Sequence, residues 1–296
     1  MIKVTVLGTS GSTPTKNRGM PSVALTYEGA VYLFDCGEGT QMKLMHYGIN
    51  ISKIRAIFIS HAHGDHIIGV AGLIRTMALN ARREPLYIFV PKGYERGIAS
   101  LVTFDKAMIG YPVVIKGISG GQVYKGKGFS VSAFRLNHSI PTYGYVFKED
   151  DKLRFVKSKA EKLGVKGTMF SELKKKRSII ANGRRITLGS VTYPEQGKKV
   201  VYATDTRPCA STVKAAKNAD LLIHEAAFAG SERSLAVERK HSTSDEAALV
   251  AKKAKVKALV TMHISARYRS SDKLLAGAKK IFPNTVVASD GYTIYI

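Results

Sequence analysis

Short apolar segments alternate with amphipathic ones along the whole chain. The apolar segments are rich in Val, Ile, Tyr and Phe, as β-strands are, and they lie at residues 3–8, 22–27, 30–35, 56–60, 86–90, 129–136, 143–147, 199–204, 221–226, 258–263, 284–289 and 292–296. Residues 66–79 and 244–255 have helical patterns, the second with Ser244 as predicted N-cap, acids in its first turn and lysines at its end. Glu28 and Gly29 predict a hairpin turn between two strands. Strands flanked by helices favour a layered α/β sandwich.

The length of 296 residues allows a sizeable core, and no repeat or low-complexity tract divides the chain, so one domain over residues 1–296 is expected. No window contains 18 consecutive apolar residues, and the N-terminus enters a strand directly without a leader pattern. We therefore expect a soluble, cytoplasmic protein that spans no membrane. Cys36 and Cys209 are too few for a disulfide framework and are expected to be reduced core residues.

The net charge of the chain is the compositional feature that says most about its partners. The chain has 46 Lys and Arg against 22 Asp and Glu, a net charge of +24 that favours a polyanionic partner such as nucleic acid or an acidic membrane surface. The alternative is a basic, solvated surface without such a partner. Residues 152–199 hold 14 Lys and Arg against 3 Asp and Glu, nearly half of the excess. This predicts a basic arm, at residues 148–199, inserted between core strands.

A histidine-rich loop, SHAHGDH at residues 60–66, follows one of the predicted strands. His61, His63 and Asp65 alternate and can point to the same side of an extended turn, and Gly64 lets the backbone bend. His66 is expected to open the next helix, so the loop can direct two ligands at each of two neighbouring points. Imidazole and carboxylate ligands without cysteine favour catalytic zinc. The alternative is a polar turn that binds no metal. It would not explain why four of the six residues at positions 61–66 are of types that bind metals.

Four ligands on one loop cannot complete two metal sites, so further ligands must come from elsewhere. His138, Asp205 and His263 each follow an apolar strand, where a layered sheet presents residues at one rim. Taken singly, such a histidine is more often a buried structural residue, but the loop makes ligation the better interpretation. Asp205 is the natural bridge, because a carboxylate between two cations can contact both.

These motifs resemble a known family. H-x-H-x-D-H followed by His, Asp and His at strand ends resembles the pattern of the metallo-β-lactamase fold. The further motifs are similar to those of ribonuclease Z, and they are LFDCGEGTQ (33–41, with Asp35), GTSGSTPTKNRG (8–19, with Pro14, Lys16 and Arg18), HEA (224–226) and HST (241–243). Ala227 departs from the family's usual threonine after HEA. The arm stretch KLGVKGTMFSELKKKR (162–177) has no proline, where many relatives carry a Gly-Pro-rich element. The resemblance spans the whole chain and implies a four-layer αββα sandwich with an inserted basic arm.

The resemblance implies a zinc-dependent endoribonuclease that removes the 3′ trailer from tRNA precursors, leaving a 3′-hydroxyl on the tRNA and a 5′-phosphate on the trailer. Two Zn²⁺ per subunit are implied, with Mn²⁺ or another divalent ion as alternative, and the expected ligands are His61, His63, Asp65, His66, His138, Asp205 and His263. Asp65 is the expected proton acceptor for water, His241 the expected donor to the leaving oxygen, and Glu225 its orienting partner. The alternatives are a helix-entry role for His241 and a structural one for Glu225. Asp35 and His224 are expected to hold the metal ligands in position without binding the ions themselves.

Substrate contacts are expected at two places. Lys16 and Arg18 are expected near the phosphates at the cut, unless their loop is simply flexible. The arm has few aromatic residues, so shape and phosphate recognition is favoured over base stacking, and the residues expected to hold the tRNA backbone are Lys174, Lys175, Lys176, Arg177, Arg184 and Arg185. The resemblance also implies a homodimer in which one subunit's arm serves the other's site, with helix 66–79 as one contact.

Two other functions stay open. Another hydrolase or phosphodiesterase of this fold would act on small substrates such as cyclic nucleotides, thioesters or sulfate esters, and it would not need the charge of the arm. A non-catalytic RNA-binding protein on a dead hydrolase scaffold would not need every type of ligand.

Overall fold

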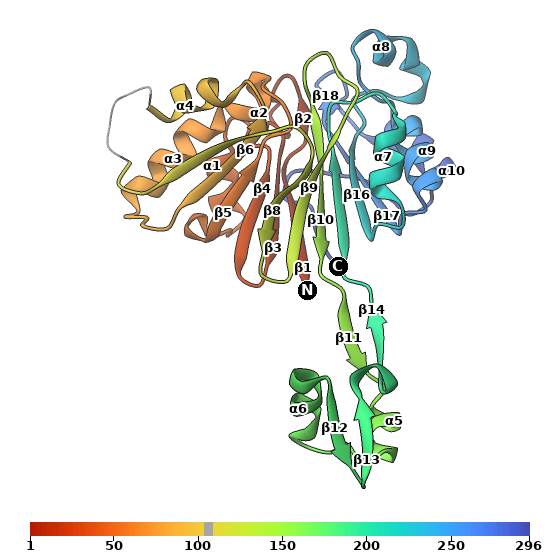
Figure 1. The fold of residues 1–296 in the computed structure, drawn as a ribbon. Helices are drawn as coiled ribbons and strands as arrows, with labels where there is room; N and C mark the ends of the chain where they lie inside the picture. Colours follow the sequence, from red (N-terminus) through yellow and green to blue (C-terminus); the bar gives the residue numbers. More distant parts are fainter. Residues whose placement is uncertain (104–108) are drawn as a thin grey trace. The chain divides into compact units, whose positions relative to one another are not determined.

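The computed structural model describes residues 1–103 and 109–296 (Figure 1). The chain divides into two compact units, one formed by Met1–Phe147 with Lys198–Ile296 and the other by Lys148–Gly197. The first is called the core unit and the second the arm unit below. None of the described helices has the length and apolar character that crossing a membrane requires.

The core unit contains two seven-stranded sheets. The first sheet consists, in spatial order, of β20 (Thr293–Tyr295), β1 (Ile2–Gly8), β3 (Ser22–Tyr27), β4 (Ala30–Phe34), β5 (Ile54–Phe58), β6 (Leu86–Pro91) and β7 (Val113–Ile118). The second consists of β19 (Thr285–Val287), β17 (Ala258–Met262), β16 (Leu221–Glu225), β15 (Lys199–Ala203), β10 (Tyr143–Glu149), β9 (Phe129–Arg135) and β8 (Gly121–Gly126). Strands β15, β16, β17 and β19 run parallel, so their carboxyl ends meet at one edge.

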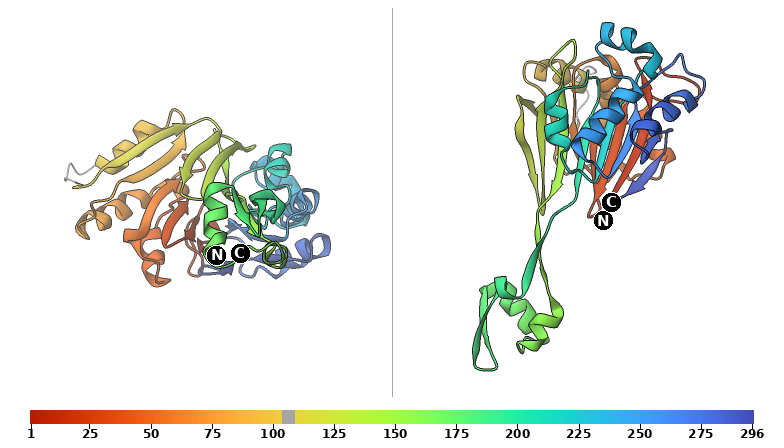
Figure 2. Two further views of the ribbon diagram at one scale, coloured as in Figure 1. Left: turned by 60° about the horizontal axis from the view of Figure 1, so that its bottom comes forward. Right: turned by 90° about the vertical axis from the view of Figure 1, so that its right-hand side faces the viewer.

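Helices cover the outer face of each sheet (Figures 1 and 2). The first sheet is covered by α1 (Thr40–His46), α3 (Gly69–Leu79) and α4 (Glu95–Thr103), and the second by α7 (Ala210–Ala216), α9 (Ser244–Ala254) and α10 (Asp272–Ile281). Aromatic rings pack between the sheets; Phe34 lies 5.4 Å from Phe58 and 5.6 Å from Tyr202, centroid to centroid. The order helix, sheet, sheet, helix confirms the predicted αββα sandwich.

The apolar runs predicted the strands well. Each of the twelve predicted strand segments overlaps an observed strand, because buried parallel and central strands are apolar on both faces. Glu28 and Gly29 have positive φ values of 47° and 78°, as the predicted two-residue hairpin requires. Strands β7 and β8 were missed because their side chains are largely half-buried or exposed and their sequences include glycine.

Two helix boundaries differ from the prediction. The helix expected over 66–79 is two helices, α2 (Gly64–Ile67) and α3, so His66 lies inside the first and does not open it. Gly69, the first residue of α3, packs directly on Gly37, where an added Cβ would lie 2.0 Å from a carbonyl oxygen. The N-cap of α9 is Thr243 in place of Ser244, and it forms a capping box with Glu246.

The arm unit has a small core of its own. Its elements are β11 (Lys152–Phe155), α5 (Lys157–Lys162), α6 (Met169–Lys176), β12 (Ser178–Ala181), β13 (Arg184–Thr187) and β14 (Thr192–Glu195). They enclose a cluster that includes Leu173, Ile186 and Val191. Residues 148–197 carry 13 Lys and Arg against 6 Asp and Glu. All six residues predicted to hold tRNA are exposed in this unit, at positions 174–177, 184 and 185.

The remaining short elements lie within the described residues of both units. They are β2 (Ser10–Gly11), β18 (Ile264–Ser265), α8 (Arg233–Glu238) and three 3₁₀ turns at Ile51–Lys53, Leu188–Ser190 and Gly230–Glu232. Cys36 is buried and Cys209 is half-buried at the start of α7, and both thiols are free.

Candidate metal centre

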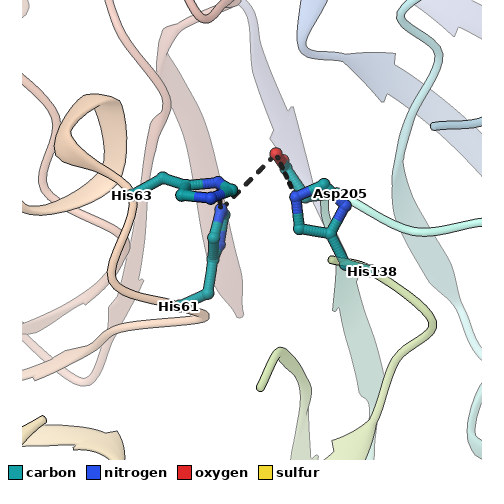
Figure 3. Close-up of side chains that lie close together, drawn as sticks. All are labelled: His61, His63, His138 and Asp205. Carbon is teal, nitrogen blue, oxygen red and sulfur yellow. Dashed lines mark hydrogen bonds and ion pairs between the residues drawn. The ribbon is translucent and has the colours of Figure 1, made fainter. Parts of the chain in front are cut away.

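The first ligand group forms where the loop after β5 meets the ends of two other strands. His61, His63, His138 and Asp205 place one ligand atom each within 4.8 Å of one another (Figure 3). Asp205 Oδ2 lies 3.5 Å from His61 Nε2 and 3.8 Å from His138 Nε2. Three imidazoles and one carboxylate, drawn from three separate segments, therefore point at one place.

The second ligand group lies against the other side of the same aspartate. Asp65, His66 and His263 place their ligand atoms within 4.8 Å of one another. Asp205 Oδ1 lies 3.4 Å from His66 Nε2 and 3.2 Å from His263 Nε2. Asp205 therefore presents a different oxygen to each group, as a bridging carboxylate would. The structure brings together all seven residues that the sequence suggested as ligands.

Unusual backbone conformations aim some of these side chains. Asp205 and His263 have φ values of 48° and 59°, in the left-handed region that most residues avoid. Such conformations persist where the surroundings enforce them, and they cluster at functional sites. Gly11 lies under His263, and a Cβ there would come within 2.6 Å of the imidazole ring. The ring's position therefore requires glycine in β2, which pairs with β18 directly after His263.

The donor set fits a divalent metal. The Nε2 atoms of His66, His138 and His263 are buried, and within the described part of the chain they have no hydrogen-bond partner. Buried polar nitrogens without a partner are costly and rare. Their clustering with two carboxylates supports ligation by these atoms. Histidine and carboxylate without cysteine match catalytic zinc and related divalent ions.

Asp35 supports ligands from both groups. Its Oδ2 accepts hydrogen bonds from His66 Nδ1 at 2.8 Å and from the Tyr202 hydroxyl at 2.7 Å. Ser60 donates its amide and its hydroxyl to Asp35, and the hydroxyl lies 2.9 Å from His61 Nδ1. A histidine that donates through Nδ1 keeps its Nε2 free for a metal. The sequence analysis did not assign Ser60 or Tyr202, although Ser60 opens the histidine loop.

Electrostatics keep the carboxylates ionised. Burial disfavours the charge on Asp205, but the attraction of His263, His66 and His61 outweighs it and holds the pKa well below the ordinary value. Burial also opposes ionisation of Asp65, but the neighbouring imidazoles of His263 and His66 overcome it, so its pKa is lowered as well. Burial lowers the pKa of His61, which keeps this imidazole neutral and able to act as a ligand.

His241 and Glu225 lie beside the ligand groups as a hydrogen-bonded pair. His241 Nδ1 is 3.0 Å from Glu225 Oε1, and the His241 ring stacks on His263 with centroids 5.2 Å apart. Burial opposes the charge on His241, but Glu225 outweighs it and raises the pKa to about 9. Glu225 is fully buried and also accepts the Thr206 amide at 2.6 Å. The geometry thus places an oriented imidazole next to the ligands.

The loop before β3 contacts the site through its backbone. The Ser12 amide donates to Asp65 Oδ2 at 3.0 Å, and Lys16 is exposed in the same loop. Arg18 is half-buried, and its Nη1 donates to the Thr9 hydroxyl at 2.7 Å and to the Ala288 carbonyl at 2.8 Å. These contacts give Arg18 a structural task in its loop, while Lys16 is accessible to a substrate.

His224 does not contact the ligands. It is fully buried in β16, its Nδ1 donates to the Glu225 carbonyl at 2.7 Å, and its Nε2 has no partner among the described residues. On neighbouring strands Ala203 and Thr261 are its register partners. Burial lowers its pKa. The structure therefore offers no direct contact for the supporting role predicted for His224.

The buried imidazole of His224 should make the fold sensitive to acid. Below about pH 6.5 the unfolded chain protonates this residue and the folded chain does not, so stability falls with pH by up to about 1.4 kcal/mol per unit. His224→Asn keeps a donor for the Glu225 carbonyl but cannot titrate. Urea unfolding of the metal-free proteins at pH 7.5, 6.0 and 5.0 should therefore show a shallower acid loss in the variant. If the free energy of unfolding fell equally with pH in both proteins, the buried His224 would not be the source of the acid sensitivity.

Comparison with known proteins identifies similar chains. Residues 2–156 match the family described as anti-Pycsar protein Apyc1, and residues 159–264 match the β-lactamase superfamily domain. The ribonuclease Z of Methanothermobacter thermautotrophicus is 39% identical over 301 residues, which cover 100% of this chain and 97% of that protein. The ribonuclease Z of Archaeoglobus fulgidus is 41% identical over 295 residues, covering 98% and 96%. The crystal structure of human tRNase Z, short form, superposes with a TM-score of 0.72 at 26% identity and covers 99% of each chain.

Proposed function

The chain belongs to the ribonuclease Z family, and from this premise we propose that it is a metal-dependent endoribonuclease that removes the 3′ trailer from tRNA precursors. Cleavage leaves a 3′-hydroxyl on the tRNA and a 5′-phosphate on the trailer. The observation that carries the proposal is the convergence of two ligand groups on the two oxygens of Asp205. A phosphodiester cut between two cations needs such an arrangement.

The proposed cofactor is two Zn²⁺ per subunit, with Mn²⁺ or another divalent ion as the alternative. One ion would be held by His61, His63, His138 and Asp205, and the other by Asp65, His66, His263 and Asp205. When bound, such ions neutralise charge on the phosphodiester and lower the pKa of water from 15.7 towards about 7. Asp35, directly and through Ser60, fixes one imidazole in each group and prepares both sites for their ion.

Three side chains are proposed to handle protons. Asp65 accepts the proton of the attacking water, since its side chain is 14% exposed and its carboxylate reaches the site's surface. His241, held by Glu225, donates a proton to the leaving 3′-oxygen. His224 is left without an assigned part in the reaction. These roles rest on proximity and hydrogen bonding.

The substrate contacts are proposed on charge and exposure. The exposed cations of the arm unit hold the tRNA backbone, and Lys16 contacts phosphate near the cut. We also propose a homodimer, supported by the exposed apolar side chains of Met42, Met45 and Ile68 around α1 and α3. We also propose a cytoplasmic location, because a tRNA precursor is the proposed substrate.

A direct cleavage assay tests the proposal. The protein is incubated with a trailer-bearing tRNA precursor and Zn²⁺ or Mn²⁺, and the new ends are mapped at nucleotide resolution. We expect one cut next to the discriminator nucleotide, with a 3′-hydroxyl upstream and a 5′-phosphate downstream, and no cut with EDTA. Turnover of small phosphodiesters without precursor cleavage would favour another hydrolase of this fold. Tight tRNA binding without any cleavage would favour an RNA-binding protein.

A further inference from the structure

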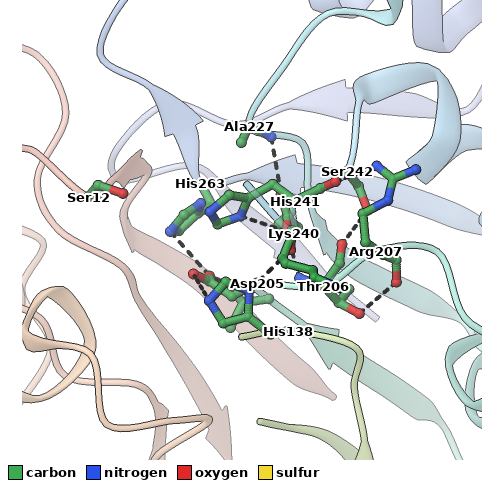
Figure 4. A network of polar contacts seen from close by, with 12 residues as sticks. Ser12, His138, Asp205, Thr206, Arg207, Ala227, Lys240, His241, Ser242 and His263 are labelled. Atoms are coloured by element: carbon green, nitrogen blue, oxygen red, sulfur yellow. Dashed lines mark hydrogen bonds and ion pairs between the residues drawn. The ribbon is translucent and has the colours of Figure 1, made fainter. Parts of the chain in front are cut away.

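The loop that carries His241 makes contacts on both sides of the metal centre. The Lys240 carbonyl accepts a hydrogen bond from His138 Nδ1 at 3.1 Å, which directs His138 Nε2 towards Asp205. The His241 imidazole contacts Glu225. The Ser242 hydroxyl donates to the Thr206 carbonyl (Figure 4). One short segment thus orients a predicted ligand and the predicted proton donor together.

The Arg207 side chain is hydrogen-bonded to this segment. Its Nη1 donates to the His241 carbonyl and, at 2.7 Å, to Glu246 Oε2, while its Nη2 donates to Glu246 Oε1. Glu246 in turn accepts the Thr243 amide at 3.0 Å. The guanidinium therefore binds the loop directly at the His241 carbonyl. It also binds both oxygens of Glu246, and Glu246 in turn holds the Thr243 amide. Both charged side chains are nearly buried, at 13% and 11% exposure, where such hydrogen bonds are strong.

The backbone around Asp205, at the end of β15, is held in place without the Arg207 side chain. The Arg207 amide donates to the Asn137 carbonyl at 2.8 Å, and the Thr206 amide donates to Glu225. Main-chain contacts therefore secure the backbone beside Asp205 whatever side chain follows at 207. The guanidinium adds the connection to the His241 loop.

We propose that Arg207 is a positioning residue for cleavage, which acts by fixing the loop of residues 240–243 so that His241 faces the leaving group. The inference rests on the proposed function and extends it, because the contacts of the Arg207 side chain go to His241 and Glu246 and not to the ligand groups. Lysine cannot replace it fully, since one ammonium cannot reproduce the planar fork that spans a carbonyl and both carboxylate oxygens.

The test compares Arg207→Gln and Arg207→Lys with Arg233→Gln. Arg233 is the matched control, because its Nε also contacts Glu246, at 3.2 Å, but its side chain is 73% exposed and no contact joins it to His241. Losing a charge-assisted hydrogen bond that orients a proton donor should lower kcat about 30- to 100-fold. We expect that loss in Arg207→Gln, with KM within about 3-fold of wild type. Arg207→Lys should fall between wild type and Arg207→Gln, and Arg233→Gln should stay within about 2-fold of wild type.

Two further measurements separate positioning from simple destabilisation. Metal content by mass spectrometry should stay within about 20% of wild type, and amide hydrogen exchange should increase at residues 240–243 in Arg207→Gln alone. The inference is overturned if Arg207→Gln matches Arg233→Gln in kcat, if it loses its metal, or if exchange at 240–243 is unchanged. Failure of the wild type to cut tRNA precursors would refute the proposed function instead, and the exchange measurement would still decide whether Arg207 holds the loop.

Discussion

Asp205→Asn is expected to abolish precursor cleavage, with a rate at least about 10⁴-fold below wild type. The substitution keeps the size of the side chain but removes the charge that faces four imidazole nitrogens at 3.2–3.8 Å. It also removes the ligand shared by both groups, so neither ion would be held with its full set. Single-turnover cleavage and metal content by mass spectrometry measure the two effects.

The controls for this prediction separate chemistry from binding. Asp272→Asn changes an exposed carboxylate at the start of α10 and should leave activity and metal content at wild-type values. Asp65→Ala should also lose cleavage, while tRNA affinity of both site variants stays within about 3-fold of wild type. An Asp205→Asn protein that retained two ions and a tenth of the activity would show that Asp205 does not bridge. Normal cleavage by Asp65→Ala would remove it as the proton acceptor.

The convergence of the candidate ligands could be predicted because the fold places them by a simple rule. Asp205 and His263 follow strands β15 and β17 directly, and parallel strands of one sheet end at a common edge. The histidine loop follows β5 of the other sheet. A sequence shows where apolar strands end, so it also shows which polar residues gather at that rim. The division of the four loop residues into two pairs followed from the expected bend at Gly64 and the helix expected to start at His66.

What supports the ligands was much harder to predict. Tyr202 looks like any other apolar strand residue, and only the structure shows its hydroxyl on Asp35. The Ser12 amide and the Lys240 carbonyl contact site residues through backbone atoms, which every residue type provides. Sequence patterns record side-chain character and period, and they contain no signal for a backbone group that tertiary packing brings 3 Å from a ligand.

His224 shows the opposite case, a motif residue that does not reach the candidate site although its neighbour does. It stands next to Glu225 in HEA, but successive strand residues point to opposite faces of a sheet. Glu225 accordingly faces the metal centre and contacts His241, whereas His224 is buried on the other face. The motif was therefore a sound guide to the segment, and the period of the strand decides which of its residues reaches the site.

Neutralising the arm is expected to weaken tRNA binding about 100-fold at moderate salt and to leave kcat within about 3-fold of wild type. The variant replaces six exposed cations with glutamine, at positions 174–177, 184 and 185. The apolar cluster around Leu173 and Ile186 is untouched, so the arm unit should stay folded. Each lost phosphate contact lowers the slope of log affinity against log salt by about 0.7–0.9. Filter binding from 50 to 300 mM KCl therefore reports how many of the six contact phosphate.

A second variant with the same change in net charge makes this test specific. It replaces six exposed lysines of the core unit with glutamine, at positions 252, 253, 255, 257, 279 and 280. Both variants lose six positive charges from the total of +24, so long-range attraction weakens similarly in the two. If tRNA is held by phosphate contacts on the arm, only the arm variant should show the large loss of affinity and the reduced salt slope. Equal losses would mean that the overall charge attracts tRNA and that the arm has no contact role. An unchanged affinity in both would place the tRNA contacts elsewhere on the chain.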